Sequence, residues 1–130
     1  MLVVDASVAL AASWGAGGFE KLGAEELVAP ALMWSEARSA LHELLWRREI
    51  TREDADATRE RLEGCPVARR THARLGAEAW RVAEELGWAK TYDAEYVGLA
   101  RLLGCRLVTL DARLKRATAR FGFVVGPTEV

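Results

Sequence analysis

The sequence has only two cysteines, no long uninterrupted apolar stretch and almost no net charge. No run approaches the roughly 20 apolar residues that a membrane-spanning helix needs, so we expect no membrane span. The apolar start of the chain is interrupted by Asp5 and has no basic region before it, which makes it a poor secretory signal and predicts a cytoplasmic protein. Cys65 and Cys105 lack both C-x-x-C spacing and a nearby histidine, which argues against zinc and predicts two buried thiols.

The charge of the chain is balanced, with 18 basic and 19 acidic residues and a formal net charge of -1. This balance argues against a protein that holds nucleic acid by overall charge alone, although it permits a local basic patch. The 130 residues, 51% of them hydrophobic and 28% charged, are enough for one folded domain spanning residues 1–130.

Short apolar runs alternate with stretches of helical periodicity along the chain. We expect strands at 2–4, 27–29, 66–69, 106–110 and 123–125, and helices at 7–12, 31–48, 51–63, 72–86, 93–103 and 111–121, with a helical turn at 19–22. Strands and helices that alternate in this way predict an α/β fold of three layers, in which a central parallel sheet has helices on both faces.

Four acidic residues stand in apolar surroundings: Asp5, Glu36, Asp93 and Asp111. An ionised carboxylate in such a place is unfavourable unless it is paired, hydrogen-bonded or bound to a metal ion. Three of the four follow predicted strands, and in open α/β sheets ligands bind beyond the carboxyl ends of the strands. Asp93 follows a helix, so this argument does not place it.

A simpler alternative exists for each acid taken alone. Asp5, Asp93 and Asp111 each stand at the start of a predicted helix, where an aspartate stabilises the free backbone N–H groups by about 1 kcal/mol as an N-cap. Glu36 lies in the first turns of a helix, and a lone glutamate there is usually solvated.

Taken together, the segments around these acids resemble the four motifs of PIN-domain nucleases, above all the VapC-type toxins of toxin–antitoxin pairs. The matching segments are Val3-Val4-Asp5-Ala6-Ser7-Val8, Ala29-Pro30 with Ser35-Glu36-Ala37, Asp93-Ala94-Glu95-Tyr96, and Leu107-Val108-Thr109-Leu110-Asp111. Their order, their spacing and the length of the chain agree with the family from end to end. Arg113 departs from some relatives, which carry another acid there.

The resemblance implies a three-layer PIN-like fold and a metal-dependent endoribonuclease that cleaves RNA phosphodiester bonds to a 5′-phosphate and a 3′-hydroxyl. Asp5 and Asp93 are the expected principal ligands of Mg2+ or Mn2+, completed by Glu36 and Asp111 directly or through water. Hard carboxylate oxygens suit these ions, and crowded carboxylates repel one another without a cation. One or two ions are possible. Ser7 and Thr109 could hydrogen-bond waters of the metal or cap the local backbone.

Basic side chains are needed to position RNA. The candidates are Arg113, Lys115, Arg116 and Arg120 on the last predicted helix, and Arg69, Arg70 and Arg74. Arginine suits phosphate because its planar fork donates two parallel hydrogen bonds, although charge runs on helices usually form a solvated face. The resemblance further implies a cognate antitoxin, which places a basic side chain among the carboxylates, and a homodimer.

Two other functional classes remain open. A phosphoacceptor signalling domain also has a parallel α/β fold with an acidic pocket, but it normally has adjacent acids near the first strand, and Asp5 has no acidic neighbour. A non-catalytic PIN-like protein would bind RNA or a partner only, and the complete set of four acids argues against it.

Overall fold

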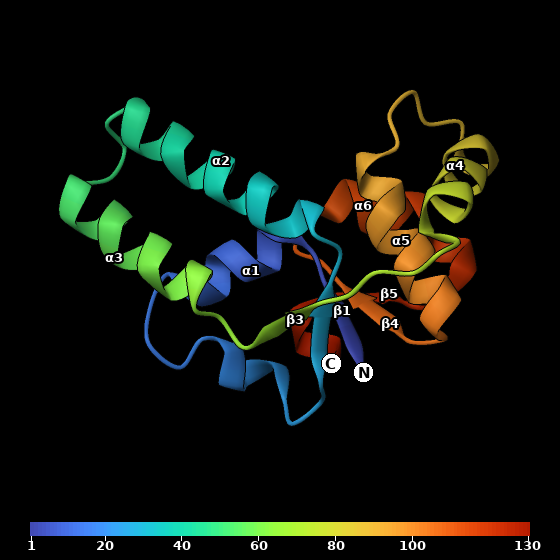
Figure 1. The fold of residues 1–130 in the computed structure, drawn as a ribbon, viewed down its shortest axis with the longest axis horizontal. Helices are drawn as coiled ribbons and strands as arrows, with labels where there is room; N and C mark the ends of the chain where they lie inside the picture. Colours follow the sequence, from blue (N-terminus) through green and yellow to red (C-terminus); the bar gives the residue numbers. More distant parts are fainter.

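The computed structural model describes residues 1–130 and contains a sheet of five parallel strands. The strands lie in the order β3-β2-β1-β4-β5, so β1 is central (Figure 1). All four strand pairs are parallel, which confirms the predicted sheet. The bounds of the strands are β1 Leu2–Val4, β2 Leu27–Ala29, β3 Val67–Arg69, β4 Arg106–Val108 and β5 Val124–Val125.

Helices cover both faces of this sheet. Figure 1 shows α1, α2 and α3 on one side of the strands and α4, α5 and α6 on the other, which confirms the three layers. The α-helices are α1 Ala6–Ser13, α2 Leu32–Trp46, α3 Arg52–Glu63, α4 Leu75–Leu86, α5 Tyr92–Leu103 and α6 Ala112–Ala117; the short 3-10 helices are η1 Phe19–Leu22, η2 Ala119–Phe121 and η3 Pro127–Glu129. None of the helices has the length and apolar content needed to cross a membrane.

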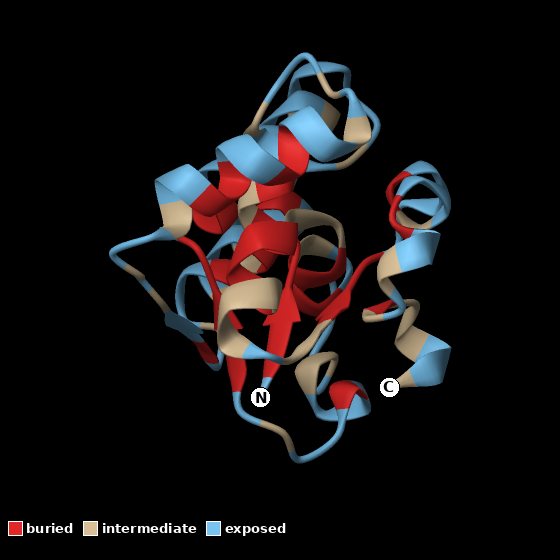
Figure 2. Cartoon of the chain, turned by 90° about the vertical axis from the view of Figure 1, so that its right-hand side faces the viewer, coloured by how far each residue is buried: buried red, intermediate tan, exposed pale blue.

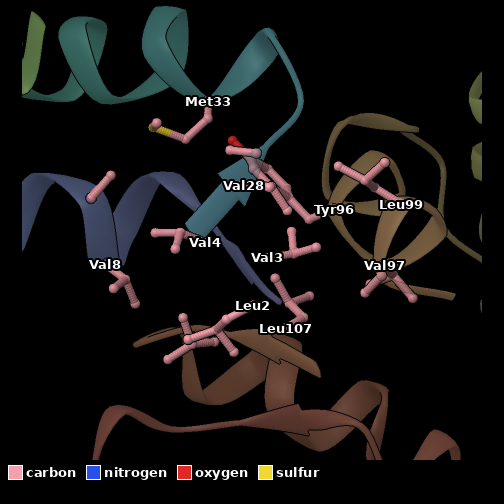
Figure 3. Close-up of a cluster of buried hydrophobic side chains, with 14 of the residues drawn as sticks. Leu2, Val3, Val4, Val8, Val28, Met33, Tyr96, Val97, Leu99 and Leu107 are labelled. Atoms are coloured by element: carbon pink, nitrogen blue, oxygen red, sulfur yellow. The ribbon is translucent and has the colours of Figure 1, made fainter. Parts of the chain in front are cut away.

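The central strand β1 is buried on both of its faces, which explains its unbroken apolar sequence. All three of its residues have no exposed surface. In Figure 3 Val3 lies on the side of Val97 in α5, whereas Val4 lies on the side of Val8 and Met33. Burial is concentrated in the strands and in the inner surfaces of the helices around them (Figure 2).

Several helices and strands are shorter in the structure than predicted, among them α2, which spans Leu32–Trp46 rather than residues 31–48. α4 begins at Leu75 rather than at residue 72, because the His72 Nδ1 atom accepts a hydrogen bond from the Arg74 backbone N–H at 3.0 Å and forms a turn instead. The helix expected at 111–121 breaks after Ala117 into α6 and η2, where the Thr118 hydroxyl bonds back to the Leu114 carbonyl at 2.8 Å. β4 ends at Val108 rather than at residue 110.

The order of the strands creates a point at which the direction of winding reverses. From the central strand β1 the chain first adds β2 and then β3 toward one edge of the sheet. It then returns through α4 and α5 to β4, which lies next to β1 toward the opposite edge. Ligands of open parallel sheets bind outside the carboxyl ends of the strands at such a switch point. The fold therefore places its natural binding site beyond the ends of β1 and β4.

Candidate active site

The four acids come from four different elements and meet at this switch point. Asp5 directly follows β1 and Asp111 follows β4, while Glu36 lies in the second turn of α2 and Asp93 in the first turn of α5. A cleft of about 640 Å³ is lined by Glu36, Asp93 and Asp111. Asp5 is buried, with 5% of its surface exposed, and its negative charge still acts on both Glu36 and Asp93.

Asp5 is held by a closed set of hydrogen bonds. Its Oδ1 atom accepts from the Ser7 hydroxyl at 2.6 Å and from the Val8 backbone N–H at 3.0 Å, and its Oδ2 atom accepts from the Thr109 hydroxyl. The two hydroxyl oxygens accept in turn from the backbone N–H groups of Leu110 and Asp111, at 3.1 and 3.0 Å. Ser7 and Thr109 thus use their only hydroxyl protons on Asp5 and join α1 to the loop after β4.

The backbone bond to Val8 shows that Asp5 is also the N-cap of α1. Asp111 is likewise the N-cap of α6, accepting from the backbone N–H groups of Arg113 and Leu114 at 2.9 and 3.2 Å. The capping interpretation is therefore confirmed for both residues. It does not exclude a place in the acidic cluster, because capping fixes the orientation of a carboxylate whose other lone pairs remain free.

The capping interpretation is wrong for Asp93. Thr91 occupies the N-cap position of α5, and Asp93 is the second residue of the helix. Asp93 accepts no hydrogen bond within the chain. Partial burial, then repulsion from Asp111 and Asp5, raises the pKa of Asp93 above its ordinary value. Nothing in the local structure of α5 stabilises this charge except the dipole of the helix.

Tyr96 is a residue of the site that sequence reasoning missed. It is almost fully buried in the core, and its hydroxyl donates a hydrogen bond of 2.5 Å to the Glu36 Oε1 atom. Burial and this bond both raise the pKa of Tyr96, so the phenol remains a donor. Burial raises the pKa of Glu36, the bond from Tyr96 offsets part of the rise, and Asp93 adds repulsion.

None of the four acids forms an ion pair with a basic side chain. Five other glutamates form ion pairs with Lys, Arg or the N-terminus, namely Glu25, Glu63, Glu78, Glu85 and Glu129, whereas none of the four clustered acids does so. Burial raises the pKa of Asp5 as well, and hydrogen bonds from Ser7, Thr109 and Val8 offset part of that rise. An uncompensated set of hard oxygen donors fits a divalent cation from solution.

The four carboxylates do not surround one common point, because no group of three or more His, Cys, Asp or Glu residues is arranged to ligate one ion. A divalent cation that retains several waters is bound directly by only one or two carboxylates. The donor set is compatible with such an ion only if part of the contact is made through water.

Of the basic residues expected to position RNA, only Arg113 lines the cleft. Arg116 is exposed but does not line it. Lys115 pairs with Glu129, Arg120 donates to the Glu85 carbonyl at 3.0 Å, and Arg69 stacks 4.9 Å from the ring centre of Trp34. The cleft contains a second basic residue that the sequence did not single out, Lys90, together with Trp88 and Tyr92.

We expect Tyr96→Phe to weaken metal binding about tenfold while leaving the fold intact. The variant keeps the buried ring and removes only the donor that orients Glu36, and partners of this kind typically change metal affinity or activity by roughly 10- to 100-fold. Calorimetric titration with Mn2+ measures the affinity. Tyr92→Phe, which removes an exposed hydroxyl in the same helix, is the matched control. Equal affinity of Tyr96→Phe and the wild type would show that Tyr96 does not position Glu36.

The acidic cluster predicts how the metal-free protein responds to pH. The folded-state pKa values of Asp5, Glu36, Asp93 and Glu95 are raised, so the folded protein binds more protons than the unfolded chain above about pH 4. The free energy of unfolding should then fall as pH increases through this window. The ion-paired glutamates have lowered pKa values and affect stability only at pH values below the ordinary pKa of glutamate. In that range the free energy of unfolding falls as pH falls.

Thermal denaturation in EDTA, from mildly acidic to neutral pH, measures this decline. Addition of Mg2+ should remove most of it, because the ion competes with protons for the same carboxylates, and NaCl at equal ionic strength controls for screening. A stability that is independent of pH without metal, or a decline that Mg2+ leaves unchanged, would contradict the predicted repulsion.

Comparison with known proteins agrees with this geometry. Residues 2–119 match the PIN domain family. The chain is 38% identical over 115 residues to VapC ribonuclease Mb0985 of Mycobacterium bovis and to ribonuclease VapC9 of Mycobacterium tuberculosis, covering 88% of this chain and 88% of each relative. Ribonuclease VapC3 of M. tuberculosis is 36% identical over 97 residues, 75% of this chain and 69% of that protein.

The crystal structure of PAE2754 from Pyrobaculum aerophilum is similar to 98% of this chain and 90% of its own, with a TM-score of 0.72 and 27% sequence identity. The resemblance seen in the four motifs is therefore confirmed over nearly the whole length of the chain. This protein belongs to the PIN-domain family and, within it, to the VapC ribonucleases.

Proposed function

We propose that this chain is a metal-dependent endoribonuclease of the VapC toxin type, and that the acidic cleft is its active site. The observation that carries the proposal is that four acids from distant parts of the chain come together at the switch point of the sheet and form no ion pair with a basic side chain. Membership in the VapC ribonucleases supports the same reaction.

In this proposal Asp5, Glu36, Asp93 and Asp111 hold Mg2+ or Mn2+. A divalent cation bound there would lower the pKa of a bound water and stabilise the leaving oxygen of the phosphodiester. The chain itself supplies orientation: Ser7 and Thr109 fix Asp5, Tyr96 fixes Glu36, and the start of α6 fixes Asp111. Without the cation the four acids repel RNA phosphates, so substrate binding and metal binding are coupled.

We further propose a cognate antitoxin as the protein partner, a homodimer as the assembly, and the cytoplasm as the place where the RNA substrate is met. Membership in the VapC family supports the first two. The acidic cleft supports an antitoxin that inserts a basic side chain, because such a group would neutralise the cluster in place of metal. Light scattering during size-exclusion chromatography measures the assembly of the purified chain.

The proposed reaction is tested by incubating RNA with the purified, partner-free protein in Mg2+ or Mn2+ and in EDTA. We expect discrete cuts that require the metal and disappear in a folded Asp5→Asn variant. Cutting by the variant at the wild-type rate would indicate a contaminating nuclease or a different active site. RNA binding by folded, metal-loaded protein without turnover on varied RNAs would favour the non-catalytic alternative.

A further inference from the structure

The cleft has a second wall that the acids do not explain. Besides the carboxylates it is lined by Trp88, Lys90 and Tyr92, which lie in and just after the loop between α4 and α5, and by Arg113 in α6. Tyr92 directly precedes Asp93, so an aromatic ring and a cluster acid enter the same cleft from one turn of helix.

The two cations of this wall are free within the chain. Neither Lys90 nor the Arg113 guanidinium forms an ion pair or a side-chain hydrogen bond, whereas Lys115, Arg101 and Arg106 are all engaged. Lys90 and Arg113 therefore add positive charge to a cleft that is also lined by three of the four acids, Glu36, Asp93 and Asp111, without forming ion pairs with them. Such a site needs a ligand that satisfies both its basic and its acidic residues. A phosphate-bearing ligand does so, because its anion contacts the basic residues and its metal counterion contacts the acids.

The aromatic residues of this wall differ in exposure. Trp88 packs partly buried against the core, whereas Tyr92 is 56% exposed and its hydroxyl makes no hydrogen bond within the chain. Tyr96, one turn further along α5, is almost fully buried. An exposed ring within a charged cleft provides a flat apolar surface, on which nucleobases of any sequence can stack.

We propose that this wall is a subsite for one unpaired nucleotide beside the scissile phosphate, with its base stacked on Tyr92 and its flanking phosphates bound by Lys90 and Arg113. The inference rests on the proposed ribonuclease function and adds to it three residues that position one unpaired nucleotide of the substrate. Paired bases are excluded, because in a duplex each base is already stacked and its face is not accessible to a side chain.

The subsite is tested by RNA binding rather than by cleavage. Fluorescence anisotropy in the wild-type background, with Ca2+ in place of Mg2+ to slow cleavage, compares a short single-stranded RNA of mixed sequence, a hairpin that contains the same RNA in its loop, and a blunt duplex. In this background Tyr92→Ala should weaken single-strand and loop binding about tenfold, within the roughly 5- to 150-fold range that stacking of one base corresponds to, while Tyr92→Phe stays within about twofold.

The charged residues of the subsite are tested by the salt dependence of RNA binding. Lys90→Ala should reduce the slope of log affinity against log salt by about 0.7, the value for one phosphate contact on a single strand, whereas Tyr92→Ala should leave this slope unchanged. Matched controls are Trp46→Ala, which removes an aromatic residue 78% exposed at the end of α2, and Lys21→Ala, an exposed lysine in η1. Both controls should bind RNA as the parent protein does.

Equal binding by Tyr92→Ala and its parent, equal affinity for duplex and single strand, or no RNA binding at all would each overturn the subsite. These results are separable from the fate of the proposed function. Binding that depends on Tyr92, combined with no metal-dependent cutting by the wild type, would retain the subsite and reject the nuclease. Metal-dependent cutting that Tyr92→Ala leaves unchanged would retain the nuclease and reject the subsite.

Discussion

Asp93→Asn should reduce metal-dependent RNA cleavage on the order of 1,000-fold, equivalent to about 4 kcal/mol of transition-state stabilisation, while leaving the metal-free protein at least as stable as the wild type. The loss of activity follows because Asp93 is a proposed principal ligand. The retained stability follows because Asp93 accepts no hydrogen bond, and its charge is repelled by Asp111 and Asp5. Solvent screening and the α5 dipole keep any gain in stability small.

Single-turnover cleavage with Mn2+ and thermal denaturation in EDTA measure the two effects. The matched control is Asp54→Asn, since Asp54 is an exposed aspartate in the first turn of α3, outside the cleft. The wild type should gain stability on addition of Mg2+, and Asp93→Asn should gain much less. Undiminished cleavage by Asp93→Asn would remove it from the active site, and a large loss of stability would show that the repulsion has been misjudged.

The sheet and the grouping of three of the four acids at its edge could be predicted from local signals alone. Each strand is a short apolar run, parallel strands align their carboxyl ends, and Asp5 and Asp111 follow β1 and β4 directly. Glu36 follows β2 closely enough to share this edge. Local signals also supported the capping interpretation, which the structure confirms at Asp5 and Asp111. The place of these two carboxylates in a metal site stays a prediction.

The order of the strands does not place Asp93 or Tyr96, because both depend on how α5 packs; Asp93 is predicted only through the resemblance of its motif to the family. α5 lies against α4 so closely that a Cβ atom added to Gly98 would stand 3.2 Å from the Ala79 backbone nitrogen. This packing directs the start of α5 toward the ends of β1 and β4. Tyr96 occupies an apolar stripe, where a tyrosine is indistinguishable in sequence from a core residue, and its partner Glu36 lies 60 residues away.

The basic residues also divide into those with a local sequence signal and those whose position depends on packing. The sequence shows a run of arginines on the last helix, but the structure engages Arg120 with the end of α4 and pairs Lys115 with Glu129. Lys90 is a single lysine in a connecting segment and has no charge pattern to reveal it. Whether a basic side chain faces the cleft is decided by helix orientation and by competing acids, neither of which the spacing of charges reports.

Thr109→Val should lower the free energy of unfolding by about 1.5–3 kcal/mol, the range for a hydrogen bond to a charged group, and weaken Mn2+ binding roughly 10- to 100-fold. Valine has nearly the same shape, so the change removes the donor to Asp5 Oδ2 and the acceptor for the Asp111 N–H without opening a cavity. Asp5 is buried, so water cannot readily replace the lost donor. Thr109→Ser, which retains the hydroxyl, should restore most of the affinity.

Thr118→Val is the matched control for this change. Thr118 is also fully buried, but its hydroxyl donates to the neutral Leu114 carbonyl within α6 rather than to a carboxylate. Its loss should cost about 1 kcal/mol or less and leave Mn2+ affinity unchanged. If Thr109→Val and Thr118→Val destabilise the protein equally and neither affects metal binding, then Asp5 does not depend on Thr109. A selective loss at Thr109 would show that the buried network orients Asp5, linking the stability of the β1 and β4 ends to the chemistry of the cleft.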